Sequence, residues 1–251
     1  MLRKKKSSVE WLEFELFQDC PIRHGVFLRR RGISKSSFAS LNVGDALGDS
    51  KREVSENKER IRQIINANKL IFVNQVHGKV IEEVPSERSY PDADALITKE
   101  SYIGLSIRHA DCQAAIFYDP QLHVLANVHA GWRGNVQNIY KSVIECFKVK
   151  FGSKVENILV GISPSLGPER AEFIDYKKEL PEDFRRFQEF PNHFNLWAIS
   201  KDQLMQNGIL SNHIEVAQIC TYSNPDDFFS YRRSKTTGRN ATVAMLLSET
   251  I

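Results

Sequence analysis

Apolar positions along this chain follow two different periods, one typical of helices and one typical of strands. Ser50 and Glu53 are spaced as in a capping box, and the apolar residues after them fall on one helical face, which predicts a helix over residues 50–66. Apolar residues at every second position over 103–107 predict a strand, and a short apolar run over 70–73 predicts another. The chain is therefore expected to combine helices with sheets.

Two apolar runs around a turn signal predict a β-hairpin. Residues 114–118 and 124–128 are mostly apolar, and Asp119-Pro120 between them is a pair that favours turns. Both arms are expected to be buried strands. The second arm leads directly into a polar, glycine-containing segment that begins at His129.

The second half of the chain continues this mixture. Apolar residues recur at helical spacing over 136–147, and Gly152 predicts the end of that helix. Further elements are predicted as a strand at 158–162, a helix at 196–207 ended by Gly208, and strands at 214–219 and 241–247. Hydrophobic density persists from Phe14 to Leu247 without a repeat or a linker, so we expect one domain over residues 1–251. The mixture of elements predicts an α+β or a mixed α/β fold, of which we favour α+β.

The charge balance excludes a general polyanion binder. The 251 residues include 34 Lys and Arg against 31 Asp and Glu, a net charge of +3, whereas such binders concentrate basic residues on one face or in one segment. The basic run from Arg3 to Lys6 lies at the N-terminus, where we expect it to be frayed. No nucleic-acid partner is therefore expected.

The hydropathy pattern predicts neither a membrane span nor export. No stretch approaches the roughly 18 apolar residues that a spanning helix needs. The segment after Lys6 carries Glu10 and Glu13 where a secretory signal has its apolar core. We expect a cytoplasmic protein with no membrane partner. No pattern fixes the oligomeric state, and we favour a monomer.

Four cysteines are scattered along the chain without a Cys-x-x-Cys pair, so neither a disulfide framework nor a zinc ribbon is predicted. They are Cys20, Cys112, Cys146 and Cys220. A chain of this length buries about 70–75% of its unfolded surface on folding, so it needs no structural metal. Any metal site in it is expected to serve function.

Three polar positions lie where apolar strands end: His77, Cys112 and His129. Two imidazoles and one thiolate leave a zinc ion one open position, as in catalytic sites, and such an ion lowers the pKa of bound water toward about 7. The separations of 35 and 17 residues form no local metal signature, and a cysteine that closes an apolar strand is more often part of the core. His109 competes for the same site, but residues three apart in an extended segment face opposite ways.

Arginines supply candidate sites for an anion. Arg133 lies at the start of the helix after Gly131, where unpaired backbone N–H groups favour phosphate, although a surface arginine paired with a carboxylate explains it equally well. Near the other end, residues 228–233 and Arg239 bring aromatic rings and arginines together. They suit the stacking of a base or the binding of a charged group, and a solvated loop explains them as well.

Four segments carry a family resemblance. In chain order they are Asn74-Gln75-Val76-His77-Gly78, Asp92-Ala93-Asp94-Ala95-Leu96-Ile97-Thr98, Ala110-Asp111-Cys112 and His129-Ala130-Gly131-Trp132-Arg133-Gly134. Together they resemble the signature segments of the bacterial YfiH family, whose members have been labelled laccase-domain or polyphenol oxidase proteins, purine nucleoside phosphorylases and peptidoglycan editing factors. The resemblance covers nearly the whole chain, and its last string is highly specific.

The resemblance implies a single-domain four-layer α/β/β/α sandwich with mixed sheets. It also implies a zinc ion, rather than copper, on His77, Cys112 and His129. The implied reactions are phosphorolysis of adenosine, inosine, guanosine and methylthioadenosine, and adenosine deamination. A purine nucleoside and phosphate are thus the expected partners. The residues expected to bind them are Arg29, Asn42, Gln75 and Arg133.

Three departures from the family pattern border the expected pocket. Arg31 replaces a glycine, His109 stands where threonine is more usual, and Ala171 replaces an aromatic residue. They leave the implied metal ligands intact. The substrate range stays open because of them.

Other functions remain open beside phosphorolysis. In a hydrolase that removes wrongly incorporated L-serine from a UDP-linked cell-wall precursor, Cys112 would be the nucleophile and His129 or His77 the base. A metal on Cys112 would block that chemistry. A copper polyphenol oxidase ranks lower, because the three methionines lie far from the motifs and no His-x-His pair is present. For deamination the proton shuttle is unassigned, since the His-x-Glu and Cys-x-x-Cys strings of zinc deaminases are missing. A metal-tuned interaction protein without activity is the remaining hypothesis.

Overall fold

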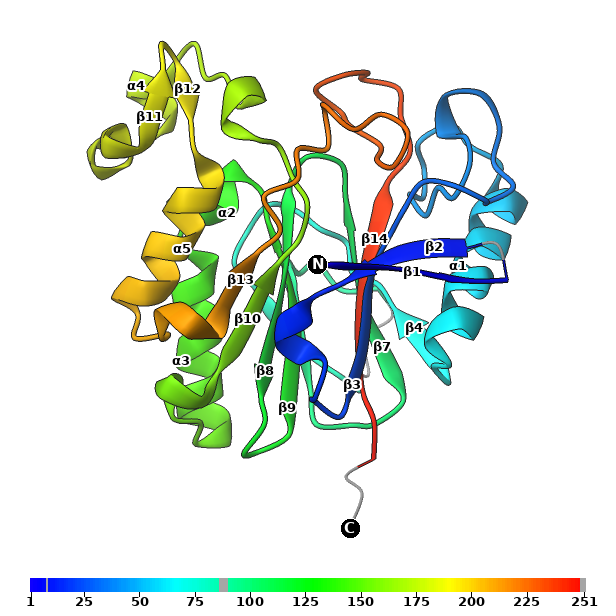
Figure 1. Cartoon of the computed structure of the whole chain (residues 1–251), viewed down its shortest axis with the longest axis horizontal. Helices are drawn as coiled ribbons and strands as arrows, with labels where there is room; N and C mark the ends of the chain where they lie inside the picture. Colours follow the sequence, from blue (N-terminus) through cyan, green and yellow to red (C-terminus); the bar gives the residue numbers. More distant parts are fainter. Residues whose placement is uncertain (8, 86–89, 249–251) are drawn as a thin grey trace.

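The computed structural model describes residues 1–7, 9–85 and 90–248, and within them two six-stranded sheets pack face to face, with helices on their outer faces (Figure 1). The strand order of the first sheet is β1 (Leu2–Lys6), β2 (Val9–Glu13), β3 (Ile22–Phe27), β14 (Asn240–Leu246), β7 (Ile103–His109) and β4 (Lys69–Ile71). The order of the second is β13 (Ile214–Val216), β10 (Leu159–Ile162), β8 (Gln113–Asp119), β9 (Val124–Ala130), β6 (Ala95–Thr98) and β5 (Ile81–Glu83). A small ribbon joins β11 (Gln188–Phe190) to β12 (His193–Phe194).

Both sheets are mixed, as the family resemblance implies. The pairs β4–β7, β10–β13 and β5–β6 are parallel, and the other neighbouring strands are antiparallel. The predicted hairpin is confirmed: β8 and β9 pair in one continuous register, from Gln113 opposite Ala130 to Asp119 opposite Val124. The predicted late helix and strands correspond to α5 (Leu196–Gln206), β10, β13 and β14.

Apolar side chains fill the spaces between the layers. One cluster, which includes Leu105, Ile116 and Leu125, lies between the two sheets. Other clusters lie between the second sheet and α3 (Ile139–Phe151), and between the first sheet and α1 (Lys51–Ile65), which covers the opposite side of the sandwich (Figure 1). The central strands are therefore buried on both faces. For this reason Gly104 and Ser106, which alternate with the apolar residues of β7, are buried as well.

Helix α1 matches its prediction, except that Asp49 and not Glu53 accepts the hydrogen bond from the Ser50 N–H. The Ser50 hydroxyl accepts a hydrogen bond from the Glu53 N–H, as in a capping box. The Ser50 N–H, however, donates to the Asp49 side chain at 2.8 Å. At the other end, Asn66 takes a left-handed conformation and ends the helix.

The helix predicted over 136–147 is two helices. The short α2 (Trp132–Val136) ends before Asn138, whose φ of +50° breaks the helical path. The Asn138 side chain then accepts a hydrogen bond from the Lys141 N–H and caps α3, which ends at Gly152 with φ +76°. Val136, expected on the buried face, is 38% exposed because it belongs to the earlier helix.

The basic N-terminal run is not frayed, which corrects the expectation. Its residues form β1 and pair with β2 in antiparallel register. Arg3 forms ion pairs with Glu10 on β2 and with Asp227, far along the chain. Of the helices that the structure describes, none combines the length and the apolar composition needed to cross a membrane.

Shorter elements carry the remaining connections. They are α4 (Tyr176–Glu179) and the 3-10 helices η1 (Glu15–Phe17), η2 (Ser36–Phe38), η3 (Val155–Asn157), η4 (Pro168–Arg170), η5 (Glu182–Phe187) and η6 (Ser211–His213). Together with β11 and β12, α4 forms a projection beside the upper end of the sandwich in Figure 1.

Candidate metal centre

A cleft of about 780 Å³ opens at the end of the sandwich where β7 and β9 end and β8 and β14 begin. The loop that leads into β14 lies at this end, uppermost in Figure 1. Five segments of the chain contribute most of its lining: 44–47, 74–77, 108–113, 129–133 and 231–239. The cleft thus forms where loops from both sheets meet.

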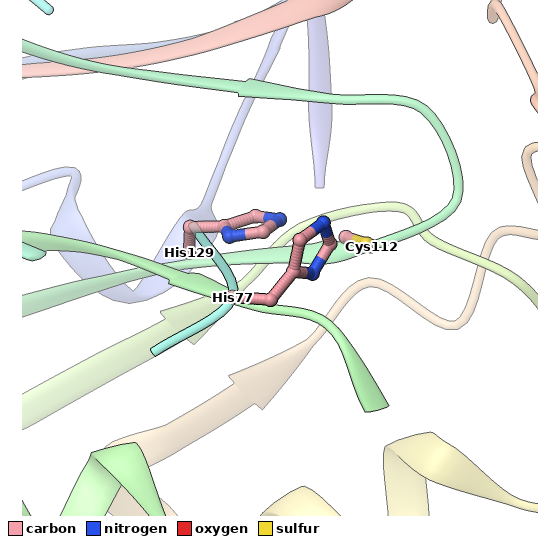
Figure 2. Close-up of side chains that lie close together, drawn as sticks. All are labelled: His77, Cys112 and His129. Atoms are coloured by element: carbon pink, nitrogen blue, oxygen red, sulfur yellow. The ribbon is translucent and has the colours of Figure 1, made fainter. Parts of the chain in front are cut away.

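Three side chains in this cleft converge on one point: His77, Cys112 and His129 (Figure 2). Their donor atoms lie within 4.8 Å of one another, and among the described residues this is the only group of three or more histidine, cysteine or acidic side chains so placed. The two imidazole rings meet edge to face, with centroids 4.9 Å apart. His129 is buried, Cys112 is half-buried and His77 is exposed, so the group opens to solvent on the His77 side.

The buried carboxylate of Asp94 holds two of these three residues. Its Oδ1 accepts hydrogen bonds from Nδ1–H of His129 at 2.8 Å and from the backbone N–H of His77 at 3.0 Å. Its Oδ2 accepts from the N–H groups of Gly78 at 2.6 Å and Val76 at 3.3 Å. Because Asp94 occupies Nδ1 of His129, Nε2 is the nitrogen left for a metal, which is the arrangement expected around metal-binding histidines.

Two residues at the site adopt a backbone conformation that side chains rarely take. His77 has φ +60° and Asp111, directly before Cys112, has φ +88°. The hydrogen bonds to Asp94 hold the first. The Asp111 carboxylate holds the second, since it accepts from the Thr221 hydroxyl at 2.7 Å and the Arg232 N–H at 2.6 Å. Strained residues held by their surroundings cluster at functional sites.

Gly131 leaves the space that the three side chains occupy. A Cβ at this position would lie 2.8 Å from Nδ1 of His77 and 3.0 Å from Sγ of Cys112. Any other residue would therefore push into the gap between two candidate ligands. Steric crowding by His77 and Cys112 therefore explains why glycine occupies position 131.

The two histidines differ in charge. Burial alone would lower the pKa of His129, but the Cys112 sulfur and the Asp94 carboxylate outweigh burial and raise that pKa to about 9. Burial, the neighbouring His129 and the charges of Arg133 and Arg239 together lower the pKa of His77. In the metal-free protein His129 is therefore protonated at neutral pH and His77 is neutral.

Two of the expected substrate ligands line the cleft. The Gln75 amide is already paired at both ends with the Arg108 backbone, at 2.7 and 2.9 Å. These two bonds fix the orientation of the Gln75 amide in the cleft wall and leave one N–H donor and one lone pair of the oxygen uncommitted. Arg133 is exposed, with its guanidinium 4.1 Å from the centre of the Trp132 ring. Its charged end has no ion pair within residues 1–7, 9–85 and 90–248.

Arg29 and Asn42 do not line the cleft, which corrects the expectation for both. The Arg29 guanidinium donates to the carbonyls of Ala39 and Pro225 and lies 4.4 Å from the Phe229 ring centre. The Asn42 side chain is fully buried and bonded to neighbouring loops. Both residues build the loops behind the cleft.

His109 contributes no donor to the group. Its Nε2 pairs with the Thr242 hydroxyl at 2.9 Å, and burial lowers its pKa to about 3. The other two departures from the family pattern, Arg31 and Ala171, do not line the cleft.

Sequence reasoning missed the role of Asp94. Asp94 stands between alanines at the start of an apolar strand, and an acid there is buried only if it is paired. That position was the available signal. Arg239 was among the late arginines expected to suit a base or a charged group, with a solvated loop as the alternative. The structure places it in the cleft, where its backbone N–H donates to Asn42.

Comparisons with known proteins agree with this fold. A family model described as multi-copper polyphenol oxidoreductase laccase matches residues 23–247. The chain is 32% identical to a purine nucleoside phosphorylase of Corynebacterium glutamicum, over 91% of this chain and 96% of that protein. It is 31% identical to the purine nucleoside phosphorylase YfiH of Escherichia coli K12, over 86% and 90%.

Solved structures show the same architecture. The hypothetical protein YfiH of Bacillus licheniformis superposes with a TM-score of 0.87 at 25% identity, over 97% of this chain and 98% of that one. YlmD of Geobacillus stearothermophilus superposes with a TM-score of 0.86 at 25% identity, over 98% and 99%. The matching model and relatives thus cover nearly the whole chain, and the chain belongs to the laccase-domain family that includes the YfiH proteins.

Proposed function

We propose that this protein is a zinc-dependent purine nucleoside phosphorylase whose metal ligands are His77, Cys112 and His129. The observation that carries the proposal is the convergence of these three donors at an open cleft. The activity named for the curated relatives supports the same class of reaction.

The donor set fits a zinc ion. One thiolate and two imidazoles are common zinc ligands, Gly131 leaves them room to approach one ion, and the cleft leaves a further coordination position accessible. Copper fits less well, because no methionine is among the residues lining the cleft to act as an axial ligand. Bound zinc would supply a Lewis acid that stabilises negative charge developing on a reacting oxygen or nitrogen.

Phosphorolysis requires the protein to hold an anion beside a developing cation. A phosphate oxygen forms a bond to C1′ of the nucleoside while the C1′–N9 bond breaks, and the electron pair of that bond leaves with the base. Positive charge develops on the ribose, so a positioned phosphate stabilises the transition state and supplies the nucleophile. The unpaired guanidinium of Arg133 is a candidate to orient it.

The aromatic part of the cleft suits a purine. Trp132, Phe173 and Tyr231 line it, and Trp132 and Phe173 pack edge to face at 5.9 Å. Such rings bind a planar base by stacking without selecting strongly among adenine, hypoxanthine and guanine. Adenosine, inosine, guanosine and methylthioadenosine are the proposed substrates. Deamination of adenosine, in which water replaces the 6-amino group, is proposed at the same site.

The test is incubation of protein of known metal content with adenosine, with and without phosphate, followed by identification of the products. Adenine and ribose 1-phosphate, formed only with phosphate, are the expected result. Inosine formed without phosphate would support deamination alone. If neither reaction occurs with zinc-loaded protein, the proposed activity is wrong.

One observation favours a second candidate function. His129 lies between the Asp94 carboxylate and the Cys112 sulfur, which is the order of acid, base and nucleophile in a cysteine hydrolase. Metal-free protein would then be the active form, acting on the amide of L-serine in a cell-wall precursor. Removal of the metal separates the two, because chelation would abolish phosphorolysis and release the Cys112 thiolate for amide hydrolysis.

A further inference from the structure

Arg239 brings a positive charge into the cleft without an acidic partner. Its Nη1 donates to the carbonyls of Thr237 at 3.0 Å and Gly238 at 3.1 Å. In the part of the chain that the structure describes, Nε and Nη2 have no hydrogen-bond partner, and no carboxylate pairs with the guanidinium. Arg239 is also partly buried, and a guanidinium that has lost water without gaining a counter-ion is costly. An anion bound there would offset that cost.

Asn42, which was expected from the sequence to bind substrate, fixes the backbone at Arg239. Oδ1 of the buried Asn42 accepts hydrogen bonds from the N–H groups of Arg239 and Gly44, both at 2.8 Å. A Cβ on Gly238 would lie 2.8 Å from the Phe229 ring and 3.0 Å from Cβ of Asn42, so the chain runs tightly against both. Asn42 therefore positions Arg239 instead of touching a ligand.

The carboxylates that line the cleft are engaged elsewhere. Asp45 forms ion pairs with Lys58 at 2.7 Å and Arg108 at 2.9 Å. Asp111 accepts from the Thr221 hydroxyl and the Arg232 N–H. Neither carboxylate forms an ion pair with Arg239, although Asp111 acts on it at longer range. A bound anion would supply the direct counter-charge that the guanidinium lacks.

Arg133 supplies a second unpaired guanidinium to the same region. It follows β9, whereas Arg239 precedes β14, so two elements of different sheets present the two side chains. Both side chains line the same cleft as His77, Cys112 and His129. The two guanidiniums therefore lie beside the candidate metal centre, which is where the attacking anion of phosphorolysis has to stand.

We infer that Arg133 and Arg239 form an oxyanion subsite beside His77, Cys112 and His129, and that its ligand is inorganic phosphate. A guanidinium matches a tetrahedral oxyanion because its planar fork donates two parallel hydrogen bonds. Phosphate as the ligand rests on the proposed function, whereas the subsite rests on the two unpaired guanidiniums.

Two further basic residues of the cleft, Arg232 and Lys235, have a different role. Arg232 donates to the carbonyl of Glu172 at 3.0 Å, and Lys235 lies 4.3 Å from the centre of the Tyr231 ring. Both are exposed, so their charges attract anions toward the entrance without fixing one in place.

The subsite is tested by calorimetric titration of inorganic phosphate into zinc-loaded protein. Arg239→Gln and Arg133→Gln should each raise the Kd of phosphate about tenfold to a hundredfold, with unchanged zinc content. Arg239→Lys, which keeps the charge without the fork, should give an intermediate Kd. This variant keeps the test decisive if Arg239→Gln does not fold.

The matched control is Arg23→Gln. Arg23 lies opposite Met245 in the β3–β14 register. Met245 is six residues after Arg239, so Arg23 lies about 20 Å from Arg239 along the direction of the strand. It removes the same charge outside the cleft, so its Kd should stay within about twofold of that of the unchanged protein.

The outcomes separate this inference from the proposed function. If phosphate binds through Arg239 and Arg133 but no nucleoside is cleaved, the subsite stands and the phosphorylase activity is wrong. If nucleosides are cleaved and Arg239→Gln leaves the KM for phosphate unchanged, the subsite is wrong and the activity stands. Absence of phosphate binding to the unchanged protein also overturns the subsite. Tighter binding of adenosine 5′-monophosphate than of phosphate, lost in Arg239→Gln, would overturn inorganic phosphate as its ligand.

Discussion

The three candidate metal ligands come from two regions that are built in opposite ways. Cys112 directly precedes β8 and His129 lies in β9, and the strands of this hairpin are buried throughout and pair without a bulge. His77 lies on an exposed turn after β4, in a left-handed backbone conformation. Packing of the hairpin and a hydrogen bond to Asp94 position His129, whereas hydrogen bonds from the backbone of the turn to the same Asp94 side chain hold His77. Metal affinity therefore depends on the hairpin for the positions of Cys112 and His129, and on Asp94 for the alignment of both histidines.

The largest effect is expected from removal of a donor on the rigid side. Cys112→Ala should lose both bound zinc and phosphorolysis, because no other thiolate lines the cleft. Elemental analysis and product assays measure this. Cys146→Ala, on α3 outside the cleft, should keep both properties. Equal zinc in the two variants would end the assignment of Cys112 as a ligand.

The next effect concerns buried histidines at the two ends of the sandwich. His24, on β3 away from the cleft, accepts a hydrogen bond from the Phe14 N–H, and burial lowers its pKa from 6.5 to about 4. Unfolding lets it take up a proton below pH 6.5, so its contribution to stability is present above that pH and is lost as the pH falls through about 4. The loss should be about 3 kcal/mol.

In the metal-free protein His129 should show the opposite sign. Its raised pKa contributes stability that is fully present below pH 6.5 and is lost as the pH rises through about 9. Denaturant unfolding between pH 4 and pH 10 measures the free energy of unfolding against pH, whose fall toward low pH is the acid limb and whose fall toward high pH is the alkaline limb. His24→Gln should flatten the acid limb alone and His129→Gln the alkaline limb alone. An acid limb that persists in His24→Gln would contradict the role given to His24.

A smaller effect on zinc affinity is expected when the Asp94 carboxylate is replaced. Asp94→Asn keeps the size of the side chain but removes the charge that orients His129 and accepts four hydrogen bonds, so zinc should bind about 10- to 100-fold more weakly. Competition with a zinc chelator measures the Kd. Asp92→Asn is the matched control, since the exposed Asp92 binds the Asn74 amide at 2.7 Å and touches no candidate ligand. Equal Kd values in the two variants would contradict the role of Asp94.

The same contrast explains what could be predicted from the sequence. The hairpin was predictable because its period, its turn pair and its burial all depend on neighbouring residues. The donors at strand ends followed from the same local pattern. Asp94 was not assigned a role, because its function depends on hydrogen bonds to Gly78, 16 residues earlier, and to the His129 ring, 35 residues later.

Errors arose where distant parts of the chain meet. The basic run at the N-terminus was predicted to be frayed, yet its Arg3 forms an ion pair with Asp227, 224 residues away. The α2–α3 break depends on the left-handed Asn138, which apolar spacing does not reveal. Arg29 and Asn42 were expected in the cleft because they lie in segments that match the family, but matching segments also contain the residues that support a site.

The smallest effect is expected where the two regions touch. Gly131→Ala would place a methyl group 2.8 Å from Nδ1 of His77 and 3.0 Å from Sγ of Cys112. His77 is the exposed member, so it should give way and weaken zinc binding about tenfold, near the lower end of the cost of an extra methyl in a packed site. Gly134→Ala is the matched control, because its Cβ would meet no atom closer than 3.5 Å. Zinc titration of both variants, with unfolding to verify the fold, measures the difference. A Gly131→Ala protein that binds zinc as tightly as Gly134→Ala would show that the ion does not lie between the hairpin and the turn.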